Sequence, residues 1–239
     1  MSGGVLTRVE VRPRARYDDG DWYWQVPAVG QLQREGLDLA PVTVLVGENG
    51  SGKSTLVEAI AAAWKDGLTA QVHHWSPGPG PDDADLHRHL QLIGERPPPQ
   101  GGCFLRAESM YGHFGGIDAS ENLLRSVGGR LNARSHGEGF LAFMDTRLTE
   151  RGLWVLAEPE SALSFRSCLR LLSLIVALRD GGSQVLLATH SPVLAAVPDA
   201  QILQLGGDGI TACAWEDLEV VQDWRDFLTA PQRWLRHLV

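Results

Sequence analysis

The sequence predicts an α/β fold in which a mostly parallel sheet is flanked by helices and preceded by an N-terminal antiparallel β part. Apolar strand-like runs alternate with helical patterns along most of the 239-residue chain, which is typical of parallel βαβ units. The run at 42–46 (VTVLV) is apolar throughout, as expected for a strand covered on both faces. The segment 5–11 instead alternates polar and apolar residues, which indicates a half-buried strand.

The remaining elements are predicted from apolar runs and helix-forming composition. An aromatic-rich strand at 22–26 is expected to pair with the first strand. The other expected elements, in chain order, are a helix at 54–64, a strand at 104–107, helices at 121–130 and 140–144, a strand at 153–157, a helix at 165–178, strands at 185–188 and 202–205, and a hairpin partner at 210–215 after the turn GGDG.

These elements are expected to form a single domain over residues 1–239. Two clusters of proline and glycine bracket residues 75–102, which indicates a flexible insertion or lid, with a short helical pattern around Leu86, Leu90 and Ile93. The tail at 216–239 carries aromatic residues among charges and is expected to form one or two amphipathic helices that dock on the body.

Composition excludes several classes of protein. A hydrophobic content of 44% with 21% charged residues is ordinary for a globular protein, and a net charge of −8 repels nucleic-acid phosphates. Cys103, Cys168 and Cys213 are widely spaced and are expected to be reduced thiols in a cytosol. No apolar run reaches the ~20 residues of a bilayer helix, so a cytoplasmic protein without a transmembrane segment is expected.

A glycine-rich segment lies between the apolar run at 42–46 and a helical pattern. It reads GENGSGKS and fits G-x-x-x-x-G-K-[ST], the phosphate-binding P-loop, in its required strand-to-helix context. Backbone amides of such a loop surround phosphate oxygens, Lys53 reaches the β and γ phosphates, and Ser54 ligates magnesium. The sequence therefore predicts binding of ATP and Mg²⁺ by Gly47, Asn49, Gly50, Ser51, Gly52, Lys53, Ser54 and Thr55.

Two further apolar strands end in residues that suit phosphoryl chemistry. Residues 153–157 run into Glu158, and a carboxylate at the end of a buried strand beside a P-loop can orient water for attack on the γ-phosphate. Residues 185–188 lead to His190, at the strand edge where ligands bind in open α/β sheets. We therefore predict that Glu158 is the general base and that His190 senses the γ-phosphate.

These three motifs, in this order, resemble those of the ATP-binding-cassette (ABC) ATPases over residues 42–192. The segment 158–164 (EPESALS) is similar to the Walker B glutamate and D-loop of that family, and 189–191 (THS) is similar to its switch-histidine motif. The resemblance implies the P-loop NTPase fold and Mg²⁺-dependent hydrolysis of ATP, with Lys53, Glu158 and His190 as the catalytic residues.

A signature-like segment, SHGEG at 135–139, is similar to the SGGE form of the SMC and RecF branch of the family. In the family this motif caps the γ-phosphate bound to the opposite subunit. The resemblance therefore implies an ATP-sandwiched homodimer to which Ser135, Gly137 and Glu138 contribute. The stretch between Lys53 and Ser135 is too short for the coiled-coil arms of SMC proteins, and the pattern resembles small single-domain bacterial ATPases.

The chain departs from the family at the residue before Glu158. Ala157 stands where the family has an aspartate that holds a magnesium-bound water, so weaker magnesium retention and slower turnover are expected. Glu108, near the position of the family's Q-loop, is either a further metal ligand or a plain surface carboxylate. The candidates for stacking on the adenine ring are aromatic residues upstream of the P-loop: Tyr17, Trp22, Tyr23 and Trp24.

Four functions are compatible with these features. The first is an ATPase that drives an unknown protein partner, and the second is a hydrolysis-impaired switch in which ATP clamps the dimer. The third is the energising subunit of a membrane transporter, against which the signature and the absent Q-loop glutamine argue. The fourth is a nucleic-acid repair or defence ATPase, which Arg125, Arg130 and Arg134 near the signature favour.

Overall fold

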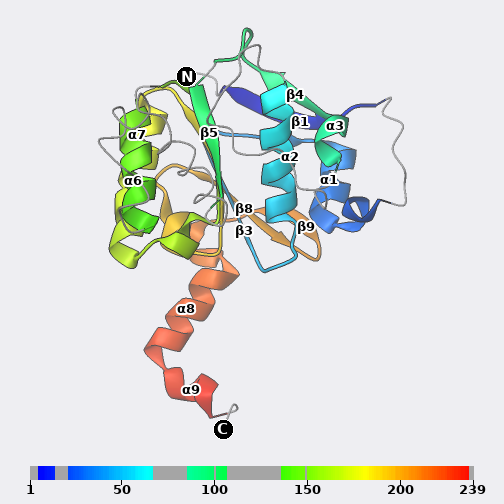
Figure 1. The fold of residues 1–239 in the computed structure, drawn as a ribbon. Helices are drawn as coiled ribbons and strands as arrows, with labels where there is room; N and C mark the ends of the chain where they lie inside the picture. Colours follow the sequence, from blue (N-terminus) through cyan, green and yellow to red (C-terminus); the bar gives the residue numbers. More distant parts are fainter. Residues whose placement is uncertain are drawn as a thin grey trace.

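Strongly apolar strands form a six-stranded sheet at the centre of the molecule (Figure 1). The computed structural model describes residues 5–13, 21–66, 85–99, 101–106, 136–148 and 150–236. The first five strands in the spatial order β5-β6-β7-β3-β8-β9 are parallel, and β9 is an antiparallel edge. The strands are β3 (Val42–Gly47), β5 (Gly101–Arg106), β6 (Gly152–Ala157), β7 (Gln184–Thr189), β8 (Gln201–Gly206) and β9 (Gly209–Ala212).

Successive side chains of a strand point to opposite faces of the sheet. Because the central strands are buried and mostly apolar along their length, both faces are apolar. Val44, Trp154 and Leu187 face α6 (His136–Arg147) and α7 (Phe165–Asp180). The residues that alternate with them, Leu45, Val155 and Leu186, pack in a second cluster with α2 (Lys53–Asp66). Figure 1 shows the two sets of helices on opposite sides of the sheet. The predicted fold class is confirmed.

The N-terminal antiparallel part is confirmed, but its strands are not all the predicted ones. β1 (Leu6–Val11) pairs with β2 (Leu37–Asp38) on one side and with β4 (Leu90–Gly94) on the other. The strand predicted at 22–26 is wrong. That segment is a 3-10 helix, η1 (Trp22–Gln25), which leads into α1 (Pro27–Glu35). A proline in the first helical turn is preorganised for a helix, and packing overrides the strand preference of the aromatic residues.

The helical pattern predicted around Leu86, Leu90 and Ile93 is only partly correct. α3 (Leu86–His89) is a single turn, and Leu90 and Ile93 belong to β4. A short apolar run does not distinguish the helical period of 3.6 residues from the strand period of 2. Here the segment forms a strand because it pairs with the edge of β1. Residues 67–84 and the helix predicted at 121–130 lie outside the described part of the chain.

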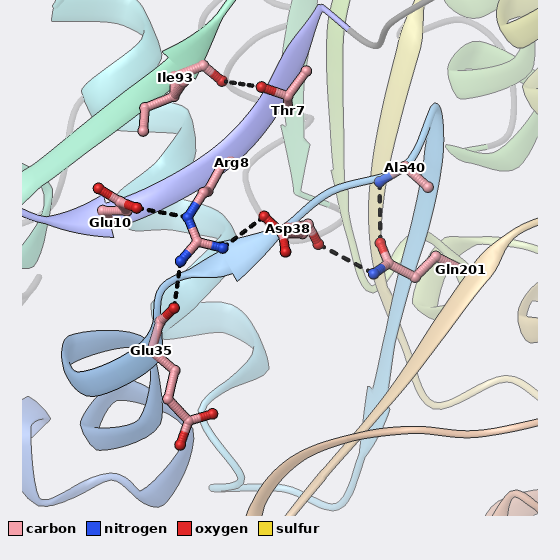
Figure 2. A network of polar contacts seen from close by, with 8 residues as sticks. All are labelled: Thr7, Arg8, Glu10, Glu35, Asp38, Ala40, Ile93 and Gln201. Atoms are coloured by element: carbon pink, nitrogen blue, oxygen red, sulfur yellow. Dashed lines mark hydrogen bonds and ion pairs between the residues drawn. The ribbon is translucent and has the colours of Figure 1, made fainter. Parts of the chain in front are cut away.

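Polar side chains join the antiparallel sheet to the main sheet (Figure 2). Arg8 on β1 donates to the Glu10 and Asp38 carboxylates, each at 2.6 Å, and to the Glu35 carbonyl at 2.5 Å. Gln201 at the start of β8 donates to the Asp38 carbonyl at 3.1 Å and accepts from the Ala40 amide at 3.1 Å. β2 is therefore tied to both sheets.

The C-terminal segment forms two helices, as predicted, but most of it does not dock on the body. The hairpin of β8 and β9 is followed by η5 (Trp215–Asp217), α8 (Glu219–Thr229) and α9 (Pro231–Leu235). Only Val221 is buried within α8 and α9, and Figure 1 shows both helices projecting from the body. No helix within the described ranges is long and apolar enough to span a bilayer.

Candidate nucleotide-binding site

The predicted P-loop connects the end of β3 to the start of α2. Gly52 has φ +97°, a conformation that favours glycine, and a Cβ there would lie 2.5 Å from Val26 Cγ1. A Cβ at Gly47 would lie 2.3 Å from the Leu205 carbonyl oxygen. Both positions therefore require glycine. Asn49 and Gly50 are exposed at the tip of the loop, whereas Ser51, Ser54 and Thr55 are partly buried.

Lys53 is turned back onto the loop. Its Nζ donates to the carbonyl oxygens of Gly47 and Glu48, each at 2.9 Å, and only 3% of the residue is exposed. Burial lowers the pKa of the Lys53 ammonium, and the negative charges of Glu158 and Glu160 partly oppose that shift. A buried ammonium held only by carbonyl oxygens in the described region is well placed to bind phosphate oxygens instead.

The predicted metal ligand, general base and γ-phosphate sensor come together at the carboxyl ends of three strands. Glu158 Oε1 lies 3.4 Å from the Ser54 hydroxyl oxygen, which donates to it. The same oxygen lies 3.3 Å from His190 Nε2. Because parallel strands end at one edge of a sheet, residues more than 100 positions apart (|i−j| = 104 for Ser54 and Glu158) meet here.

Glu158 has an unusual backbone conformation. Its φ and ψ are 49° and 48°, in the left-handed region, which for a residue other than glycine costs about 1–3 kcal/mol. Its amide nonetheless donates to the Ala188 carbonyl at 2.9 Å. Such conformations cluster at functional sites. The turn directs the Glu158 side chain away from β6 and toward the P-loop.

Glu160 is a site residue that the sequence analysis missed. It lies in η3 (Pro159–Ala162), and its Oε1 accepts a hydrogen bond from the backbone amide of His190 at 2.5 Å. Glu160 therefore holds the backbone of the His190 segment, while the ring of His190 lies beside the Glu158 carboxylate, with Nε2 3.3 Å from Oε1. The signal was present in the sequence as a second carboxylate two residues after Glu158, but the pattern does not reveal its partner.

Three buried polar atoms at this edge lack hydrogen-bond partners among the described residues. They are the Ser51 hydroxyl oxygen, Glu160 Oε2 and His190 Nε2, whose 3.3 Å approach to Glu158 is not a hydrogen bond. Buried polar atoms without partners are costly and point to a ligand or water. Magnesium bound with a nucleotide takes oxygen ligands from one or two side chains, the phosphates and water. The Ser54 hydroxyl and the nearby Glu158 carboxylate suit that requirement, although Ala157 is 1% exposed and apolar.

The signature-like segment begins α6. Gly137 is buried against the turn that follows Glu158, since a Cβ on it would lie 2.9 Å from the Ala162 carbonyl oxygen. Glu138 is exposed in the first turn of α6. Other predicted residues lie outside the described part of the chain: Ser135, the metal candidate Glu108, the adenine candidate Tyr17, and Arg125, Arg130 and Arg134.

The remaining adenine candidates lie in η1, next to the helix that contacts the P-loop through Val26. Trp22 is 55% exposed, whereas Tyr23 is buried and its hydroxyl donates to Asp21 at 2.7 Å. Trp24 is partly buried, with its ring centroid 5.0 Å from that of Tyr23. Tyr23 is therefore a core residue. Trp22 and the partly buried Trp24 stay candidates for the adenine.

Comparison with known proteins agrees with this geometry. A model of the AAA domain family matches residues 29–72. The cytochrome c biogenesis ATP-binding export protein CcmA of Salmonella typhi is 30% identical over 176 residues, which cover 69% of this chain and 83% of that protein. The chain belongs to the ABC ATPase family. The arabinose import ATP-binding protein AraG of Pseudomonas savastanoi is 29% identical over 188 residues.

The match to AraG covers 69% of this chain and 36% of that protein. The chain therefore spans about a third of the length of the sugar-import relatives it matches. Two solved structures share the ABC fold. A metal-chelate type ABC transporter superposes with a TM-score of 0.50 at 15% identity, covering 94% of this chain and 89% of that chain. An SMC head bound to the C-winged helix domain of ScpA gives 0.51 at 13% identity, covering 88% and 98%.

Proposed function

We propose that this chain binds ATP with Mg²⁺ and hydrolyses it within a nucleotide-dependent homodimer that acts on a protein partner. The observation that carries this proposal is the meeting of Ser54, Glu158 and His190, with one carboxylate oxygen within 3.4 Å of the hydroxyl and 3.3 Å of the imidazole. These are the side-chain types that phosphoryl transfer requires: a metal ligand, a base for water and a donor to the γ-phosphate.

The P-loop residues bind and orient the triphosphate. Lys53 exchanges its two carbonyl partners for phosphate oxygens, and the Ser51 hydroxyl, which lacks a partner in the described region, gains one. Charge-assisted hydrogen bonds of this kind are about twice as strong as neutral ones. When bound, magnesium neutralises phosphate charge. Ser54 is the residue that would ligate it, and the Glu158 carboxylate lies beside the Ser54 hydroxyl.

Glu158 then acts on the attacking water. Its carboxylate accepts a proton from the water as the water oxygen bonds to the γ-phosphorus, and the bond from that phosphorus to the β-phosphate oxygen breaks to release ADP. His190 donates a hydrogen bond to the γ-phosphate oxygens. Glu160 keeps His190 in place through its backbone amide. Positioned general bases contribute about 10²–10⁴-fold to rate. Because Ala157 supplies no carboxylate to the metal's water shell, we propose a low turnover.

Dimerisation would complete the site. In this proposal the segment at 135–138 of one copy covers the γ-phosphate bound to the other copy. The exposure of Glu138 in the first turn of α6 and the packing of Gly137 against the turn after Glu158 support this arrangement. A helix N-terminus also favours negative charge. The related import and export ATP-binding proteins are named for transport, and we leave the partner of this chain open.

The test is phosphate release together with nucleotide affinity in purified protein. We expect saturable, Mg²⁺-dependent release, and a loss of at least about 100-fold in Glu158→Gln with ATP affinity retained. Glu216→Gln, on an exposed carboxylate of η5, is the matched control and should keep the wild-type rate. An unchanged rate in Glu158→Gln contradicts the assignment of the base, and absent ATP binding contradicts the whole proposal.

Ala157 supports a second candidate, a switch module that binds ATP and clamps the dimer with negligible turnover. The residue is buried in an apolar cluster beside the site. ATP-induced dimerisation without phosphate release would favour this candidate. Mg²⁺-dependent release that depends on Glu158 would favour the ATPase.

A further inference from the structure

The C-terminal arm, residues 222–236, carries a large exposed apolar surface. Trp224 is 51% exposed, Leu228 68% and Trp234 46%, and Phe227 and Leu235 are also exposed. In α8 the apolar side chains follow the spacing i, i+3, i+4, so that Trp224, Phe227 and Leu228 share one face. Exposed apolar surface of this density marks an interaction site.

The segment before the arm, residues 215–221, is anchored to the body. Trp215 Nε1 donates to the Pro192 carbonyl oxygen at 2.8 Å, and Leu218 and Val221 are buried in the core cluster. From Gln222 through Thr229 every residue of α8 is exposed. A helix of fewer than about 12–15 residues is marginal in water without packing, and α8 has 11 residues. The arm therefore needs a partner to stabilise it.

The charges of the arm select the partner. α8 carries the acidic residues Glu219, Asp223 and Asp226 with one basic residue, Arg225, whereas the segment from α9 to 236 has Arg233 and Arg236 and no acidic residue. In an antiparallel, two-fold symmetric pair, α8 of each arm lies against α9 of the other arm. Acidic α8 then faces basic α9 while the apolar faces pack together. The net charge of −8 disfavours nucleic acids and anionic lipid surfaces.

We infer that the arm pairs with the arm of a second copy, antiparallel and without nucleotide. This pairing is independent of the proposed function, because it uses neither the P-loop nor the signature-like segment. It would hold two cassettes together between rounds of ATP binding. The ATP-dependent contact between the two cassettes would then form within an existing dimer rather than between free chains. The effective concentration of one cassette for the other is raised by that linkage.

The experiment measures the mass of the whole chain by sedimentation over a concentration series, in EDTA without nucleotide. We expect a dimer for the wild type and for Lys53→Ala, whose change lies outside the arm. The double variant Trp224→Glu, Leu228→Glu should dissociate at least about 100-fold more readily. Phe165→Glu, on a 65% exposed side chain of α7, is the matched control and should remain dimeric.

Charge reversal tests the antiparallel arrangement. Asp223→Lys with Asp226→Lys should weaken the dimer about tenfold or more, as should Arg233→Glu with Arg236→Glu, and all four changes together should restore it. Unchanged thermal unfolding of the body excludes misfolding. Three results would each overturn the inference. They are a wild type that is monomeric without nucleotide, a dimer that survives Trp224→Glu with Leu228→Glu, and a variant with all four charge reversals whose dimerisation stays weak.

Discussion

The two ends of the six-stranded sheet treat buried polar groups in opposite ways. At the amino ends, Gln184 uses all of its amide: Oε1 accepts from the Leu6 amide at 2.6 Å, and Nε2 donates to the carbonyls of Leu6 at 2.7 Å and Ala40 at 2.8 Å. At the carboxyl ends, the Ser51 hydroxyl and Glu160 Oε2 are buried without partners among the described residues.

This difference distinguishes buried polar groups that stabilise the fold from buried polar groups that are available to a ligand. Satisfied buried networks stabilise and specify a fold, and Gln184 and Gln201 fix the antiparallel sheet against the main sheet. Unsatisfied groups cost stability, as does the left-handed backbone of Glu158. A ligand that supplied the missing partners would recover that free energy. Substitutions at the amino ends should therefore change stability, and substitutions at the carboxyl ends should change nucleotide binding or turnover.

The largest expected effect is on stability, from Gln184→Leu. This change removes three buried hydrogen bonds to backbone groups of Leu6 and Ala40, so the free energy of unfolding should fall by about 3–5 kcal/mol. Urea unfolding measures it. Gln91→Leu, on an exposed side chain of β4, should stay within about 0.5 kcal/mol. If the two variants are equally stable, the amino ends do not carry the structural role assigned to them.

Lys53→Ala should reduce ATP affinity by at least about 100-fold, or 2.7 kcal/mol, because charge-assisted bonds to phosphate are lost. Calorimetric titration measures the change. The nucleotide-free protein should keep its stability or gain some, since a buried ammonium is removed. Unchanged ATP affinity in this variant would show that the carboxyl ends of the main-sheet strands are not the nucleotide site.

Ala157→Asp should lower the stability of the nucleotide-free protein by about 2 kcal/mol, because it places a carboxylate in an apolar cluster. Mg²⁺ with ATP should restore that stability, and turnover should rise about tenfold or more. Thermal unfolding with and without Mg-ATP, and phosphate release, measure the two effects. Ala157→Asn has a similar size without the charge, and a rate gain in that variant would show that metal charge is not the cause.

Glu160→Gln should lower turnover about tenfold while the dissociation constant for ATP stays within about twofold, because Glu160 positions His190 rather than binding phosphate. Glu160→Ala should lose more, since the amide oxygen of glutamine still accepts the His190 N–H. Turnover and affinity are measured on the same preparations. A parallel loss of affinity would place Glu160 among the nucleotide ligands instead.

The smallest expected effect is a dependence of ATP affinity on alkaline pH. Burial lowers the pKa of Lys53, so affinity should fall, by less than about tenfold up to pH 9, as the ammonium loses its proton. The sign for stability is opposite. The unfolded chain binds that proton more tightly, so this contribution to stability rises with pH between the lowered pKa and the ordinary lysine value. Affinity in Lys53→Arg should be flat over this range.

The sequence by itself determined the features that rest on local pattern. The P-loop lies within one strand-turn-helix unit, and β3, β6 and β7 are apolar runs whose period needs no distant partner to recognise. From the ends of those strands the sequence also predicted that Glu158 lies beside the P-loop and that His190 lies at the sheet edge where ligands bind. Parallel strands share an edge, and the distances of 3.4 and 3.3 Å agree with that reasoning.

Only the tertiary structure decided what depends on partners distant in the chain. The aromatic segment at 22–25 became a 3-10 helix because Tyr23 packs into the core, and Leu90 joined a strand because β1 offered a free edge. The bond from the His190 amide to Glu160, and the exposure of α8 beyond Val221, likewise follow from packing between elements. Hydrogen bonds and burial are set by three-dimensional neighbours, which a local period does not encode.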